Sequence, residues 1–170
     1  MFAVATPEGG DMHDRTLMAC FLALLIGCVA GLRSVTAPAA VSWAAHLGRL
    51  HLDATWLAFL GYAWTPWVLT LLAAGELIAD QLPSTPSRTE PVGFGARLIS
   101  GAVSGAAVGT AGGTMVGGML AGIAGAVVGT LAGHSFRARL AAAFRRDRPA
   151  AFIEDAIALG AALAIAMALR

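Results

Sequence analysis

The chain has 170 residues, of which 58% are hydrophobic and only 12% are charged, and its formal net charge is +1. Soluble globular domains carry about 25% charged residues, so the composition argues against an ordinary soluble domain and favours an integral membrane protein. The near-neutral charge, with no basic stripe carrying interleaved aromatic residues, indicates no nucleic-acid partner.

The N-terminal region combines a polar tail with the first apolar run. Residues 1–15 are polar and predict a disordered tail, which leaves residues 16–170 as a single polytopic membrane domain, beginning with a span over Thr16–Leu32. Cys20 and Cys28 are about 12 Å apart along this helix, too far for a disulfide, and we expect both to be buried small apolar residues. The tetrad LIGC ending at Cys28 resembles a lipobox, so lipidation after cleavage is the alternative.

A second apolar segment, Val35–Gly48, is too short to span a bilayer comfortably and predicts a re-entrant or interfacial helix. Arg33 and Ser34 precede it, and the pattern continues with Thr36 and Pro38, which together indicate a helix break with exposed backbone donors. Such breaks bind anions or substrates in transporters. The alternative is an arginine that snorkels to lipid headgroups.

The next region is rich in aromatic residues and precedes a second span over Thr65–Leu82. Aromatic side chains collect where a membrane meets water, so this region predicts an interface. His46, His51 and Asp53 lie just before it, but their spacing matches no metal signature, and we interpret them as interfacial polar groups. The aromatic residues are Trp56, Phe59, Tyr62, Trp64 and Trp67.

Glycine then recurs at nearly every fourth position. A single helix over this run would be about 48 Å long against a bilayer core of about 30 Å, which predicts two spans, Phe94–Gly112 and Thr114–Gly133, broken within Thr110–Thr114. Small residues at this spacing allow membrane helices to pack closely, so the run predicts glycine-zipper packing. The residues on the lattice are Gly101, Gly105, Gly109, Gly113, Gly117, Gly125, Gly129 and Gly133.

The C-terminal region holds an arginine-rich stretch, Ser135–Arg148, predicted to be an interfacial helix, and a last span over Ala150–Leu169. Arginine is enriched on the cytoplasmic side of membrane proteins, so this connection is expected inside. With five spans, the N-terminus is then cytoplasmic, the C-terminus is outside, and Arg33 falls on the outer side. Six spans with an outer N-terminus is the alternative.

Charged residues inside apolar helices indicate a polar cluster near the cytoplasmic side. Glu76 and Asp80 share one helix face, and Glu154 and Asp155 open the last span. Intramembrane acids of this kind serve as proton or cation relays or form a polar headgroup site. The alternative is a structural ion-pair network. The residues expected to contribute are Glu76, Asp80, Glu154, Asp155, Arg88 and Arg97, whereas Arg33 and Ser34 at the helix break form the second candidate site.

Four segments resemble a known family when taken together: Ala30–Gly48, Gly75–Pro91, Gly95–Gly109 and Ile153–Leu159. They are similar to the bacterial inner-membrane proteins grouped as domain of unknown function 4126, over most of the chain. The resemblance implies a small polytopic membrane protein and no particular reaction. Independently, each half of the chain has an arginine followed by a later helix with acids, which suggests an inverted repeat.

The sequence therefore predicts an all-α integral membrane protein of about five transmembrane helices and one re-entrant or interfacial helix. We expect a small inner-membrane transporter or permeation protein that forms a dimer or larger homo-oligomer in the lipid bilayer. The alternatives are a lipid-headgroup-binding protein or lipid-phosphate enzyme, and a structural assembly factor. Because the chain has no nucleophile elbow, phosphate loop or zinc cysteine pair, a non-enzymatic role without cofactor or metal is favoured.

Overall fold

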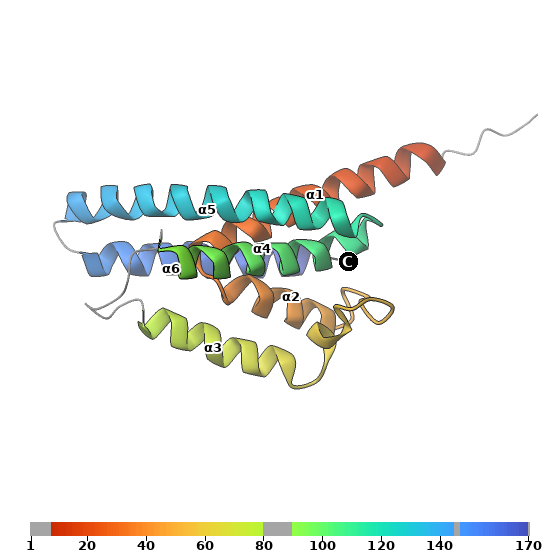
Figure 1. Cartoon of the computed structure of the whole chain (residues 1–170), viewed down its shortest axis with the longest axis horizontal. Helices are drawn as coiled ribbons and strands as arrows, with labels where there is room; N and C mark the ends of the chain where they lie inside the picture. Colours follow the sequence, from red (N-terminus) through yellow and green to blue (C-terminus); the bar gives the residue numbers. More distant parts are fainter. Residues whose placement is uncertain (1–7, 80–89, 145–146, 170) are drawn as a thin grey trace, which may run out of the picture.

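The computed structural model describes residues 8–79, 90–144 and 147–169, and its regular structure is helical throughout these ranges. Within them the chain forms six α-helices and one 3₁₀-helix (Figure 1). In chain order these are α1 (Glu8–Leu32), α2 (Thr36–His46), η1 (Ala58–Gly61), α3 (Thr65–Ala79), α4 (Pro91–Ala111), α5 (Met115–Phe144) and α6 (Asp147–Ala168).

The helices run alternately back and forth (Figure 1). α1, α3 and α5 run toward one end of the molecule, and α2, α4 and α6 run back from it. We call the end where α1 stops and α6 begins the cluster end, and the opposite end the terminal end. At the terminal end, Thr16 of α1 donates a hydrogen bond to the carbonyl of Gly112 (3.0 Å), and Arg49 donates one to the carbonyl of Met167 (2.9 Å). The start of α1 and the end of α6 therefore lie on the same side.

Four of the described helices are long and apolar enough to cross a membrane: α1, α4, α5 and α6. α3 is a shorter apolar helix of 15 residues, and α2 has 11 residues. The predicted all-α membrane architecture is thus confirmed. α2, η1 and α3 together form a hairpin that leaves the cluster end and returns to it, packed beside the four long helices.

The glycine lattice brings the backbones of α4 and α5 into direct contact. The predicted break lies where α4 ends at Ala111 and α5 begins at Met115, and Gly113 between them has φ of 69°, a conformation that favours glycine. A Cβ atom added to Gly105 would lie 2.4 Å from the carbonyl oxygen of Gly118. One added to Gly122 would lie 2.1 Å from the carbonyl oxygen of Gly101. Glycine is therefore required on both helices.

A different face of α5 packs against α1. A Cβ atom on Gly125 or Gly129 would lie 2.1 or 2.2 Å from a carbonyl oxygen of α1, and one on Gly27 of α1 would lie 2.2 Å from the carbonyl oxygen of Gly122. The lattice is thus shared between two partners. The pattern missed Gly118 and Gly122 on α5, and Gly27 and Gly31 on α1. Among its remaining members, Gly109 packs against Gly118, Gly117 meets the side chain of Thr114, and Gly133 is buried.

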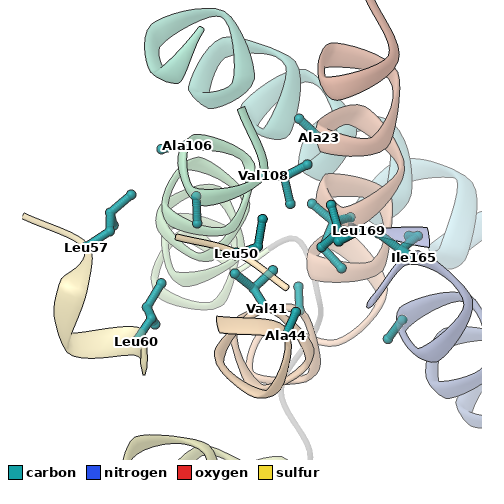
Figure 2. Close-up of a cluster of buried hydrophobic side chains, with 14 of the residues drawn as sticks. Ala23, Val41, Ala44, Leu50, Leu57, Leu60, Ala106, Val108, Ile165 and Leu169 are labelled. Carbon is teal, nitrogen blue, oxygen red and sulfur yellow. The ribbon is translucent and has the colours of Figure 1, made fainter. Parts of the chain in front are cut away.

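An apolar core fills the space between the hairpin and the long helices toward the terminal end (Figure 2). Leu50 and Leu57, from the connection that follows α2, are almost completely buried there with Val41 of α2. Val108 of α4 and Ile165 of α6 close the same cluster. The apolar connection therefore packs against the long helices, and this packing anchors α2 and η1 to them.

Two segments differ from the predictions. Residues 8–15, expected to be a disordered tail, belong to α1, and acidic residues in the first turns of a helix are favoured by the helix dipole. The stretch Ser135–Phe144, expected to form a separate helix, continues α5 because no proline or glycine interrupts it. α6 begins at Asp147 and accommodates Pro149 in its first turn, where a missing N–H is tolerated.

Candidate functional site

The ends of several helices bring charged side chains together at the cluster end. Arg33, the first residue after α1, donates a hydrogen bond from Nη2 to Oδ1 of Asp155 on α6. The Arg33 side chain is completely buried and that of Asp155 is 10% exposed. An ion pair held away from water in this way links the first and last helices directly. The sequence singled out both residues but assigned them to separate sites, with Arg33 on the opposite side of the membrane in the five-span arrangement; the ion pair shows that this separation is wrong.

The break between α1 and α2 is occupied by a carboxylate from α3. The backbone N–H and the hydroxyl of Ser34 each donate to Oε1 of Glu76 at 2.7 Å, and the N–H of Val35 donates to Oε2 at 2.9 Å. The donors predicted from the Arg33–Ser34 pattern are therefore present, and an internal anion satisfies them. A negative charge at the start of α2 also interacts favourably with the dipole of that helix.

Two hydroxyl groups tie the same break to α4 and α5. Ser100 of α4 donates to the carbonyl of Ser34, and Thr130 of α5 donates to the carbonyl of Gly31 at 3.2 Å. These bonds satisfy carbonyl groups at the C-terminal end of α1, which have no partner within their own helix. Side chains from α3, α4, α5 and α6 therefore all bond to the segment between α1 and α2.

Glu154, the neighbour of Asp155, points to a different helix. It is only 1% exposed, and its Oε2 lies 4.0 Å from Nη1 of Arg137 on α5. Arg97 near the start of α4 is 7% exposed, so it too is a buried part of this end of the molecule. Ion pairs and buried guanidinium groups therefore extend the cluster toward α4 and α5.

The structure brings together most of the residues that the sequence singled out. Arg33, Ser34, Glu76 and Asp155 meet at the break, and Glu154 and Arg97 are buried at the same end of the bundle. The predicted members Asp80 and Arg88 lie outside the described residues.

Sequence reasoning missed several polar residues of the cluster end. Ser100, Thr130 and Arg137 make the contacts described above, yet a serine or threonine in an apolar helix carries no signal of its own. The hydroxyl groups of Thr36 and Ser104 are also buried, at 3% and 0% exposure, and make no hydrogen bond within the described part of the chain. Buried polar groups are nearly always bonded, so such exceptions call for an explanation.

The terminal end has a different character. Trp64 is 80% exposed and Tyr62 is also exposed in the connection between α2 and α3, and Trp67 is exposed in the first turn of α3. This arrangement fits the predicted aromatic interface with lipid headgroups. His46 faces the carbonyl of Gly61 at 3.4 Å, and no group of three potential metal ligands occurs among the described residues.

Comparison of the chain with protein-family models, with curated proteins and with solved structures found no match. The resemblance to domain of unknown function 4126 therefore stays a prediction, and the function is argued from the site alone.

Proposed function

We propose that the chain is a small membrane transport or permeation protein whose buried carboxylates bind a proton or a cation. The observation that carries this proposal is the buried pair of Arg33 and Asp155, set between helices long and apolar enough to cross a membrane. Ionisable groups within membrane helices are costly, and they typically mark ion pathways and proton relays. Glu154, which is almost fully buried next to Asp155, supplies a second carboxylate.

The location that fits this role is the bacterial inner membrane, with the cluster end facing the cytoplasm. Arg97 near the start of α4, and Arg137 and Arg139 near the end of α5, belong to that end, whereas Arg15 near the start of α1 and Arg49, which bonds to Met167, belong to the terminal end. Arginine is enriched on the cytoplasmic side. Because α1 begins at the terminal end, this orientation places the N-terminus outside, which replaces the cytoplasmic N-terminus expected from five spans and agrees with the alternative of six.

A homo-oligomer also belongs to this proposal, and α3 offers a surface for it. Nothing lies within 4 Å of where a Cβ atom of Gly75 would stand, and Leu71 and Ile78 on the same helix are 75% and 69% exposed. A small residue flanked by large apolar ones allows a second helix to approach closely in a membrane. Introducing Gly75→Cys, with Cys20 and Cys28 replaced by serine, is expected to yield a disulfide-linked dimer in native membranes.

The transport proposal is tested by reconstituting the protein in liposomes that contain a pH-sensitive dye and imposing a potassium diffusion potential. Wild-type protein is expected to conduct protons above the level of protein-free liposomes, and Asp155→Asn is expected to abolish the excess. Asp53→Asn is the matched control, because Asp53 is exposed and lies outside the cluster. Equal flux in wild type and Asp155→Asn, with both folded, contradicts the proposal.

A further inference from the structure

The backbone and hydroxyl donors that bind the carboxylate of Glu76 have the chemistry of an anion-binding site. We propose that the three donors at the α1–α2 break form a binding site for a small monovalent anion. In the structure the side chain of Glu76 occupies this site and competes with the anion for it. Two backbone N–H groups and one hydroxyl converge on a single carboxylate at 2.7 to 2.9 Å. A free anion of similar size needs the same donors, and it binds when the carboxylate leaves.

A second, independent observation points to a ligand at this place. The hydroxyl of Thr36, in the first turn of α2, is buried and has no hydrogen-bond partner in the described ranges. The hydroxyl of Ser104 on α4 is in the same condition, one turn beyond Ser100, which itself bonds to Ser34. Thr36 directly follows Val35, one of the three donors, so a buried hydroxyl without a partner lies next to them in the chain and calls for a polar ligand.

The charges around the break set the valence of the guest. Arg33 is paired with Asp155, and the partial positive charge at the start of α2 faces the carboxylate of Glu76. Once the Glu76 carboxylate leaves, one negative charge restores the balance. A doubly charged anion adds a further negative charge near Asp155, and this repulsion disfavours it.

The helix that carries Glu76 is the least enclosed of the hairpin. The contacts of α3 are mainly with α2 and η1, and its residues Leu71 and Leu72 are exposed. Moving α3 therefore withdraws the carboxylate without disturbing the contacts between α1, α4 and α5. This inference deepens the proposed transport function, on which it rests for its biological role, by naming an anion as a further ligand.

The test compares thermal unfolding of the detergent-purified protein in sodium bromide and in sodium gluconate of equal concentration. A ligand that binds only the folded state raises the unfolding temperature. Bromide is expected to raise it by about 2 °C or more in Glu76→Ala, and by less in wild type, where the carboxylate competes. Glu90→Ala is the matched control, because Glu90 is exposed and its side chain does not cap α4.

Two further variants make the result decisive. Adding Ser34→Ala to Glu76→Ala removes the hydroxyl donor and is expected to weaken the bromide effect. If Glu76→Ala yields no folded protein, Glu76→Met takes its place, because methionine has a similar length but carries no oxygen that could accept from the three donors. An equal bromide shift in wild type, in the Glu76 variant and in Glu90→Ala overturns the proposal.

The two proposals fail separately. A bromide shift specific to the Glu76 variant, together with no proton flux in liposomes, supports the anion site and contradicts the transport role. Proton flux that depends on Asp155, together with no specific bromide shift, leaves the transport role and overturns the anion site.

Discussion

Two parts of the molecule are held together in different ways. In the glycine core, formed by α1, α4 and α5, backbones touch through glycines such as Gly105, Gly122 and Gly129. In the hairpin of α2, η1 and α3, side chains make the connections. Trp43 donates to Thr70 at 2.9 Å. The carboxylate of Glu76 accepts three hydrogen bonds from the α1–α2 break.

The difference indicates where the molecule is able to move. Backbone contact at van der Waals distance leaves no alternative arrangement, because any shift opens a void or creates a clash. A few hydrogen bonds from side chains allow two discrete states that differ by a few kcal/mol. We therefore expect the glycine core to act as the frame and α3, the part of the hairpin that contacts mainly α2 and η1, to carry any functional motion.

The largest effect is expected from a side chain in the glycine core. Gly122→Val places a branched side chain where even a Cβ atom lies 2.1 Å from the carbonyl oxygen of Gly101. We expect a loss of about 4 kcal/mol or more, seen as little folded protein in size-exclusion chromatography after detergent extraction. Gly160→Ala is the control, since nothing lies within 4 Å of its Cβ position. Equal yields for the two variants would show that α4 and α5 separate easily.

The next largest effect is expected from breaking the buried ion pair. Arg33→Leu leaves Asp155 buried without its cation, which typically costs about 3–5 kcal/mol. The measurement is thermal unfolding in detergent. Adding Asp155→Leu is expected to recover most of the loss, because the uncompensated charge is gone. A double variant as unstable as the single one would mean that the pair contributes through packing rather than charge.

A smaller effect, confined to the hairpin, is expected from Glu76→Ala. Three hydrogen bonds to a half-buried carboxylate are lost, and we expect a cost of about 2–3 kcal/mol. Hydrogen exchange followed by mass spectrometry is expected to speed up in α2 and α3 and to stay unchanged in α4 and α5. Faster exchange throughout the chain would contradict the division into a frame and a hairpin.

The smallest effect is expected from Trp43→Phe. This change removes the indole N–H that bonds to Thr70 but keeps a ring against Trp67, whose centroid lies 5.0 Å away. A cost of about 1 kcal/mol is expected in thermal unfolding. Trp64→Phe, at a side chain that is 80% exposed, serves as the comparison and is expected to change little.

The helices and the acidic members of the cluster were largely predictable from the sequence, although Arg33 and Ser34 were expected to form a separate site. Glycine and proline mark the breaks near Arg33 and Gly113, and charged residues stand out in apolar helices. The end of the molecule at which Arg33 lies was not predictable, because it depends on whether α2, with only 11 residues, crosses from one end to the other. Counting α2 as a membrane crossing reverses the side expected for each element before it relative to those after it, so this short helix determines which topology the sequence predicts.

The partners within the cluster were also beyond the sequence. That Glu76 reaches Ser34, and that Asp155 rather than Glu154 takes Arg33, depends on how the helices are rotated about their axes. Glycines occupy so many positions of α5 that the sequence does not show which of them face α4 and which face α1. The structure assigns Gly118 to α4, Gly125 and Gly129 to α1, and Gly122 to both of these helices.

The unequal lengths of the helices have a consequence for the surrounding lipid. α5 has 30 residues, so it extends about 45 Å, whereas α2 with 11 residues extends only about 17 Å. A bilayer core of about 30 Å is too thin for the one and too thick for the other. We therefore expect lipid beside the hairpin to be thinner than lipid beside α5, so that a change in acyl-chain length shifts the hairpin more than the opposite side of the protein.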